Sequence, residues 1–298
     1  MTLRRLQPVL SLLCLFVFNF VILSALPGGP LTEEAPLEPA VRSKLETHWD
    51  LAGPWYEKFF RYFIAVLGGD WGFSLSRPDF PVRDLVLQSF FTSLKLGGLG
   101  FILSFSLGIG WALFAYKKTS FLMEQISLVL ISVPLLFLAP FLMWIFAFYL
   151  GWLPAVMVER PQAWILPVIC IALRPSAVVS RIFLRSLKSE SSAAYLRTAK
   201  AKGLTEWRVL LHHQLRNSFV PIVGHLPQLM LGLLSGSFIV ETLFSMPGAG
   251  RQFVLALEAR DYPVISGLVF LYGAILIVLH FLSDEIIRRL DPRVGDLP

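Results

Sequence analysis

Long apolar runs are the feature that most limits how this chain folds. A helix needs ~20 mostly apolar residues to cross the hydrocarbon core of a bilayer. Six runs approach or exceed that length, at residues 8–27, 90–115, 124–150, 163–186, 218–243 and 263–287. Of the 298 residues, 55 % are hydrophobic and only 15 % are charged, whereas a soluble domain carries about 25 % charge. The sequence therefore predicts an all-α integral membrane protein with about six transmembrane helices.

The distribution of Lys and Arg predicts the direction of these spans. Cytoplasmic loops of membrane proteins carry the excess of both residues. With both termini in the cytoplasm, the two short outer connections hold only Arg160, Arg251 and Arg260, and the long segment 181–216 lies inside. We therefore expect cytoplasmic termini, and we attribute the net charge of +6 to topology rather than to a nucleic-acid partner.

The spans suggest one membrane domain with an outer insertion. Residues 1–27 form a first helix without a small-residue cleavage signature, so we expect it to be retained. Residues 28–89 form an extracytoplasmic insertion, and residues 90–298 form the core domain. The aromatic-rich stretch 49–63 suggests either a helix at the lipid interface or a docking surface for an extracytoplasmic partner.

Segment 189–216 has the pattern of two helices joined by a glycine. Residues 189–202 predict one helix, with Ser189, Ser191 and Ser192 as candidate N-caps and Gly203 as the residue that closes it. Thr205 is expected to cap the second helix. The alternative is an ordinary loop whose charges only set orientation, but that alternative does not explain the glycine between two helical patterns.

This segment resembles the coupling motif of ABC importer permeases, in which Glu-Ala-Ala, three further residues and Gly precede a second conserved stretch. Arg197, Thr198 and Ala199 occupy the first three positions, and Gly203 occupies the glycine. The variant is similar to the oligopeptide/dipeptide/nickel branch of the family. Segments 26–30, 69–74, 240–251, 260–263 and 291–293 resemble that branch as well. One departure is Gly29, where the branch commonly has Asp.

The resemblance implies a permease subunit in a bacterial cytoplasmic (inner) membrane. Two permease chains would form the pathway, two ATPase subunits would bind ATP and Mg below it, and a solute-binding protein would deliver cargo from outside. This chain would bind no cofactor, and it contains no GxxxxGK[ST] phosphate loop. The cargo would be a peptide or peptide-like solute, with nickel or another non-peptide solute as the alternative. The residues implied in ATPase coupling are Tyr195, Leu196, Arg197, Thr198, Ala199, Ala201, Lys202 and Gly203.

Two charged residues within the spans are candidates for the translocation pathway. Arg174 lies about ten residues into the fourth span, where a cation costs at least ~2.5–3.5 kcal/mol on insertion scales. It either lines a water-filled path and attracts anionic groups of the cargo, or forms a structural ion pair. Glu241, near the outer end of the fifth span, contributes either to an outer gate or to an interfacial cap.

In the coupling segment, Tyr195 and Leu196 are expected to fill a pocket in the partner.

Other functional classes lack the residues that they need. The chain has no HExxH and no GxSxG, which argues against a polytopic enzyme and leaves no candidate catalytic residue. His212 and His213 are adjacent on a predicted helix and do not face one site, so no metal site is expected. A channel or a membrane scaffold stays open as an alternative, but a channel does not explain segment 189–216, and a scaffold would not need Arg174 or spans interrupted by proline.

Overall fold

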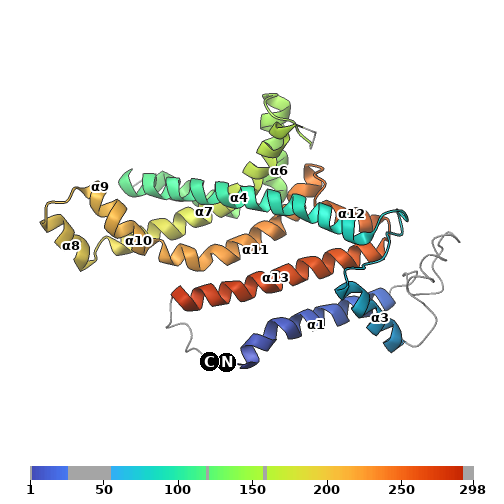
Figure 1. Cartoon of the computed structure of the whole chain (residues 1–298). Helices are drawn as coiled ribbons and strands as arrows, with labels where there is room; N and C mark the ends of the chain where they lie inside the picture. The colour runs from blue at the N-terminus through green and yellow to red at the C-terminus, as the bar shows by residue number, and fades with distance from the viewer. Residues whose placement is uncertain (1, 26–54, 119–120, 157–159, 291–298) are drawn as a thin grey trace. The chain divides into compact units, whose positions relative to one another are not determined.

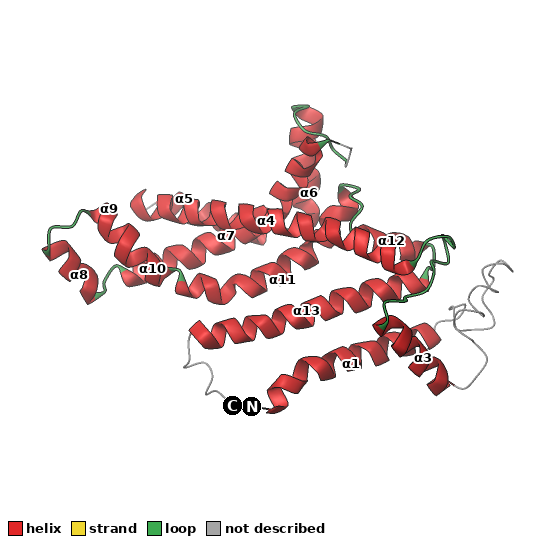
Figure 2. Cartoon of the chain, viewed as in Figure 1, coloured by secondary structure: helices red, strands yellow, loops and turns green. Residues whose placement is uncertain are grey.

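The computed structural model describes residues 2–25, 55–118, 121–156 and 160–290, which are mostly helical (Figure 1, Figure 2). The segments resembling the permease branch at 26–30 and 291–293 lie outside them. The first helices are α1 (Thr2–Ala25), α3 (Trp55–Leu67), α4 (Val82–Lys118), α5 (Phe121–Ser132) and α6 (Leu135–Met143), the last continuing as a π-helix (Trp144–Tyr149). A 3-10 turn (Pro161–Trp164) leads into α7 (Ile165–Glu190). The remaining helices are α8 (Ala194–Ala201), α9 (Glu206–Val209), a π-helix (Leu210–Gln214), α10 (Leu215–Ser218), α11 (Val220–Leu243), α12 (Ala249–Glu258) and α13 (Tyr262–Leu290).

Four helical segments of the described chain are long and apolar enough to cross a membrane. They are Val82–Tyr116, Pro161–Glu190, Val220–Leu243 and Tyr262–Leu282. Each contains most of a span predicted from the sequence, although α4 begins eight residues earlier than the predicted start at 90. The first predicted span corresponds to a shorter apolar helix, Gln7–Val21. The count of six spans and their direction stay predictions.

The predicted span 124–150 is not one straight helix. Helices α5 and α6 are bent by 104° relative to each other. Pro134 is the N-cap of α6, with φ −63° and ψ 142°. A residue before proline is driven out of the α region, so the helix ends before Val133-Pro134 and restarts in a new direction. This segment is therefore a broken span or a re-entrant loop.

The described chain divides into two compact units, of which the first contains residues 1–93 and 247–281. Its buried centre joins the start of α4 to α12 and α13 through Val82, Val86, Ala249, Ala256, Val264 and Leu268. Asn19 of α1 donates from Nδ2 to Ser266 Oγ of α13 at 2.7 Å, and Tyr62 of α3 lies 2.8 Å from the same oxygen. The sequence division into 1–27, 28–89 and 90–298 does not anticipate this unit, because its members are far apart in the chain.

The same unit brings two of the segments that resemble the permease branch into contact. Asp261, which is 1 % exposed, directly precedes α13. Its carboxylate accepts hydrogen bonds from the Ser74 hydroxyl, the Ser76 hydroxyl (2.7 Å) and the backbone N–H of Leu75 (3.1 Å). Asp261 thereby fixes the turn between α3 and α4. Within the insertion only residues 55–89 are described, so neither interpretation of its function is tested.

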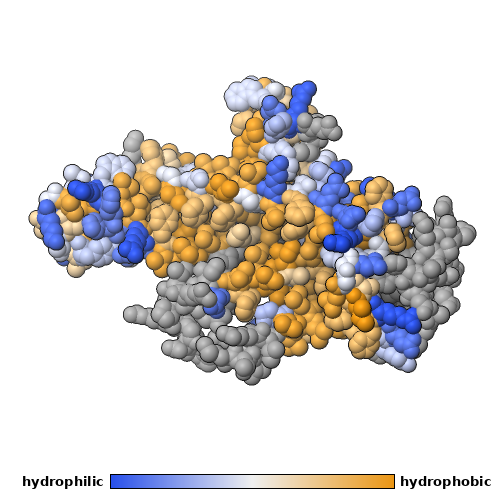
Figure 3. All heavy atoms as spheres, viewed as in Figure 1, coloured by the Kyte–Doolittle hydropathy of each residue, from blue (hydrophilic) through white to orange (hydrophobic). Residues whose placement is uncertain are grey.

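The second unit contains residues 94–246 and 282–298 and is organised around α7. One apolar cluster joins α7 to α4, α6 and α11 through buried residues such as Leu96, Leu142, Ile171 and Leu233. A second cluster, with Ala112, Phe183, Leu187 and Ile222, joins the far ends of α4, α7 and α11. Helices α8 and α9 project beyond those ends (Figure 1). In Figure 3 the surface over α8 and α9 is rich in hydrophilic side chains, unlike the mostly hydrophobic surface beside it.

Candidate coupling element

The element at 189–216 is built around a glycine turn that ends α8. Gly203 has φ +79°, in the left-handed region that glycine adopts without a Cβ penalty. Its N–H donates to the Lys200 carbonyl at 2.9 Å, and the N–H of Leu204 donates to the Ala199 carbonyl at 3.4 Å. This pair of bonds is the Schellman motif, with glycine at the C′ position. The predicted role of Gly203 as the closing residue is confirmed.

Helix α8 has one face against α9 and one face exposed. Leu196 is 3 % and Ala199 is 6 % exposed, and both pack with Val209 of α9. The apolar contact of Leu204 with this cluster accompanies the Schellman turn. The exposed coupling residues predicted from the sequence are Tyr195, Arg197, Thr198, Ala201, Lys202 and Gly203.

The predicted outward roles of two residues need correction. We expected Leu196 to fill a pocket in a partner and Ala199 to lie at a contact surface. Because positions three apart share a helix face, both side chains turn toward Val209 and hold α8 to α9. The surface available to a partner consists of the other six positions.

The predicted helix 189–202 is divided in two. Helix α7 continues to Glu190, and α8 begins at Ala194 after a short turn. The candidate capping serines bond backward instead: Ser191 Oγ donates to the Lys188 carbonyl (2.6 Å) and Ser192 Oγ to the Ser189 carbonyl (3.1 Å). Ala193 is the N-cap of α8 and Thr205 that of α9, and neither forms a side-chain capping bond.

A buried glutamine connects this element to two membrane helices. Gln214 is 4 % exposed and lies at the end of the π-helix Leu210–Gln214. Its Nε2 donates to the hydroxyl of Tyr116 in α4 at 3.0 Å and to the carbonyl of Leu187 in α7 at 2.7 Å. Single π-turns inside helices often mark functional positions. Here the turn is followed by α10 and directs one amide toward the ends of both α4 and α7.

A second set of hydrogen bonds fixes the base of α8. The Tyr195 hydroxyl donates to Glu190 and accepts from Asn217 Nδ2 at 2.9 Å. Partial burial, together with the bond to Glu190, raises the pKa of the Tyr195 phenol above its ordinary value. The phenol therefore stays protonated at neutral pH and keeps its role as donor. Tyr195 is consequently tied to the end of α7 and to α10, besides being 39 % exposed.

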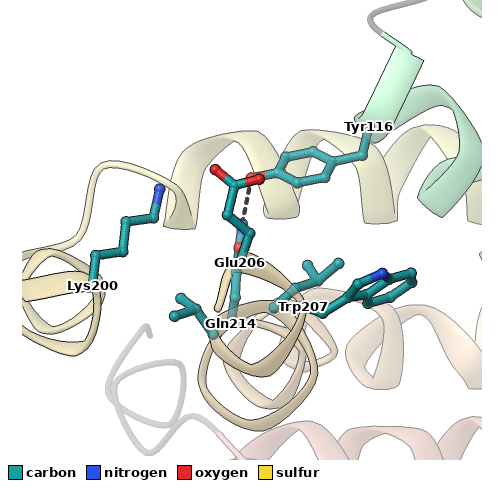
Figure 4. A pocket seen from close by; sticks show the side chains of 7 residues that line it. Tyr116, Lys200, Glu206, Trp207 and Gln214 are labelled. Carbon is teal, nitrogen blue, oxygen red and sulfur yellow. Dashed lines mark hydrogen bonds between the residues drawn. The ribbon is translucent and has the colours of Figure 1, made fainter. Parts of the chain in front are cut away.

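A cavity of about 610 Å³ lies between the element and the end of α4. Figure 4 shows Tyr116, Lys200, Glu206, Trp207 and Gln214 around it. Lys200 and Glu206 bring opposite charges to its wall. Any motion of α8 relative to α9 changes the shape of this cavity, because Lys200 lies on α8 and the other lining residues of the element lie on α9 and the π-helix that follows it.

The two predicted pathway residues lie in contrasting surroundings. Arg174 is exposed on α7, the span with the largest buried share in the described chain. None of the described acidic side chains lies within ion-pair distance of its guanidinium. Glu241 is fully buried near the end of α11, between the core residues Val240 and Phe244. The structure therefore does not bring them together in one described contact.

Sequence reasoning missed Gln214 and Asp261, and it expected no metal site. Gln214 lies in the second predicted helix of this segment, and nothing in its sequence pattern indicates a π-turn. Asp261 lies in segment 260–263, which resembles the permease branch, but its contact with Ser74 joins positions 187 residues apart. In the described part of the chain, no three His, Cys, Asp or Glu side chains are grouped so that they could hold a metal ion.

Residues 104–296 match the family described as "Binding-protein-dependent transport system inner membrane component". The chain belongs to this family. Its matched region includes α5 to α13 and with them the whole element 189–216. The protein is therefore a transport subunit of the inner membrane rather than a catalytic enzyme, as the sequence predicted.

Full-length relatives place the chain more closely. It is 32 % identical to the dipeptide transport system permease protein of Bacillus subtilis, covering 95 % of this chain and 94 % of the relative. It is 33 % identical to the oligopeptide transport system permease protein of Haemophilus influenzae, covering 98 % and 97 %. The predicted membership in the oligopeptide/dipeptide/nickel branch of ABC importer permeases is confirmed.

Solved structures agree on the fold. An amino acid ABC transporter matches 69 % of this chain and 94 % of its own chain, with a TM-score of 0.54 and 19 % identity. An inward-facing MetNI methionine ABC transporter matches 70 % and 96 %, with a TM-score of 0.58 and 13 % identity. At these identities the likeness supports the permease fold alone.

Proposed function

We propose that this chain carries peptides inward as one permease subunit of an ATP-driven importer, and that α8 is where a partner ATPase acts on it. The observation that carries the proposal is the form of the element 189–216. Its exposed face on α8 projects beyond the membrane helices, and its buried face is tied to α4 and α7. A loop that only oriented the spans would need neither the Schellman turn nor the buried amide.

The geometry suggests how force passes from a partner to the spans. The exposed side chains Arg197, Thr198 and Ala201 would enter a groove on the ATPase. The apolar contact of Leu196 and Ala199 with Val209 would make α8 and α9 move together. Gln214 would carry that movement to the ends of α4 and α7. Rigid-body movement of one bundle against another is a common form of alternating access.

The proposal requires partners that supply what this chain lacks. Two ATPase subunits would hold ATP and Mg, a second permease chain would complete the pathway, and a solute-binding protein would deliver cargo from outside. Membrane lipid would surround the apolar helices, and no nucleic acid is involved. Arg174 and Glu241 are proposed to line the pathway, Arg174 on the exposed side of α7 and Glu241 within the packed end of α11.

Peptides are favoured over nickel because the curated relatives described above are named for dipeptide and oligopeptide transport. The test is uptake in a host that lacks its own peptide and nickel importers and expresses the complete transporter. We expect ATP-dependent uptake of labelled di- and tripeptides and no uptake of radioactive nickel. Uptake of nickel without uptake of peptides would show that the cargo is nickel rather than peptides, and ion conduction without ATP would favour a channel.

A further inference from the structure

Arg174 begins a row of cations along one face of α7 and is the member farthest from the predicted cytoplasmic end of that helix. Arg181, Arg185 and Lys188 follow it at spacings of seven, four and three residues. At 3.6 residues per turn these positions lie within about 60° of one another around the helix axis. The opposite face carries the buried residues Phe183 and Leu187. We call Arg174, Arg181 and Arg185 the basic stripe.

Only one acidic side chain of the described residues reaches the row. Glu124 of α5 bonds Lys188 Nζ with its Oε1 at 2.6 Å, and both side chains are about half exposed, at 46 % and 50 %. Arg181 and Arg185 lie within electrostatic range of the same carboxylate. None of the three arginines of the basic stripe is within ion-pair distance of an acidic group in the described chain. The row therefore keeps a net positive charge.

Membrane physics limits what such a row can face. Arg174 and Arg181 lie about 14 and 24 Å along α7 from its outer end at Ile165, at 1.5 Å per residue. A hydrocarbon core about 30 Å thick that began at Ile165 would contain Arg174 near its middle and would place Arg181 close to its cytoplasmic boundary. Cations there are costly unless they face water or an anion. An ion pair with another chain would satisfy Arg174 alone, whereas a polar path along this face of α7 would accommodate Arg174 together with the arginines that follow it toward the cytoplasmic end.

We propose that the basic stripe is an anion-binding track that guides the carboxylates of peptide cargo along the inner half of the pathway. This rests on the proposed peptide transport. Arginine suits the role because its planar guanidinium binds a carboxylate through two parallel hydrogen bonds. The track is directed, since Glu124 provides a competing carboxylate at its cytoplasmic end. That carboxylate weakens the hold on anionic cargo at the exit and favours release.

The test compares two tripeptides that differ by one carboxylate, Ala-Glu-Ala and Ala-Gln-Ala. The glutamate side chain is ionised at pH 7, and both peptides keep the same termini. Their labelled uptake is measured in the peptide-importer-deficient host with the complete transporter. The double variant Arg181→Gln/Arg185→Gln is expected to lower the Glu-to-Gln uptake ratio about fivefold, equivalent to roughly 1 kcal/mol. Arg181→Lys/Arg185→Lys keeps the charge and is expected to retain most of the ratio.

Two further variants separate the stripe from general effects of charge. Arg160→Gln removes an exposed cation from the outer connection and is expected to leave the ratio unchanged. Glu124→Gln removes the competing carboxylate and is expected to raise the Glu-to-Gln ratio under limiting peptide. The Glu124→Gln measurement keeps all the arginines, so it does not depend on whether the arginine variants insert into the membrane. The amount of each variant in the membrane fraction normalises all uptake values.

Each result distinguishes one explanation. Equal loss of both peptides in the double variant would overturn the track and assign the arginines to lipid phosphates or to orientation. A ratio that stays unchanged or falls in Glu124→Gln would overturn the competing role of that carboxylate. Absence of uptake of either peptide by the wild type would overturn the peptide proposal itself, together with the inference built on it.

Discussion

Glycines two residues apart on α4 have opposite surroundings. A Cβ added to Gly108 would lie 2.7 Å from the carbonyl oxygen of Ser176 and 2.7 Å from Val179 Cβ, both on α7. A Cβ on Gly110 would meet no described atom within 4 Å. The sequence alone treats the two glycines alike, because the contact depends on which face of α4 meets α7.

Gly108→Ala is therefore expected to destabilise the protein while Gly110→Ala is not. Overpacking against a helix backbone costs about 1–3 kcal/mol, whereas alanine at an open helical position reduces the entropy of the unfolded chain. Thermal unfolding of the purified protein in detergent measures the difference. Equal midpoints for both variants would contradict the close approach of α4 and α7.

Gly203 tests backbone conformation rather than space. No described atom lies within 4 Å of a Cβ placed there, but φ is +79°. A residue with a Cβ pays about 1–2 kcal/mol in the left-handed region, and asparagine pays less than alanine. We expect Gly203→Ala to reduce ATP-dependent uptake more than Gly203→Asn, at equal amounts in the membrane. The opposite order would show that the Schellman turn is not what the position requires.

At the scale of elements, local patterns predicted most of the coupling segment and failed where tertiary contacts decide. The glycine turn and the start of α9 at Thr205 follow from residues within a few positions of each other. The turn at 191–193 does not, because Ser191 and Ser192 bond back to α7 rather than forward to α8, a choice that helix propensity leaves undetermined. The bend at Pro134 had a local signal, but its 104° angle depends on packing.

Gln214→Leu tests the connection between the element and the spans. The substitution removes the hydrogen bonds to Tyr116 and Leu187 and replaces the amide with an apolar side chain of similar size. Losing buried hydrogen bonds costs roughly 1–3 kcal/mol. In the assembled transporter we expect ATP hydrolysis to continue while peptide uptake per ATP falls. Amide hydrogen exchange in residues 205–218 should become faster.

Tyr116→Phe is the matched control for that experiment. It removes the hydroxyl that accepts from Gln214 and leaves the bond to the Leu187 carbonyl in place. We expect a smaller loss of uptake per ATP than for Gln214→Leu. Unchanged coupling in Gln214→Leu, with normal assembly, would exclude the amide as the connection between the coupling element and the ends of α4 and α7.

At the scale of the whole molecule, the sequence predicted the helical membrane class and the four spans that the described chain contains, but not the grouping of helices into two compact units. Hydrophobic runs identify membrane helices, yet they carry little information about which helices pack together. The bond between Asn19 and Ser266 joins positions 247 residues apart, and no local pattern indicates it. Membership in the permease family follows instead from several short segments in a fixed order, which together are far more specific than any one.

The most direct test of the account is whether a bulky group on the exposed face of α8 detaches an ATPase. The tagged chain is co-expressed with its transporter partners and purified gently, as wild type, Ala201→Trp and Ala259→Trp. Ala201 is exposed on α8, and Ala259 is also exposed but follows α12. We expect the ATPase to co-purify with the wild type and with Ala259→Trp and to be lost from Ala201→Trp. Full retention by a folded Ala201→Trp, or no ATPase with the wild type, would contradict the assignment of α8 as the site where ATP hydrolysis acts on this permease.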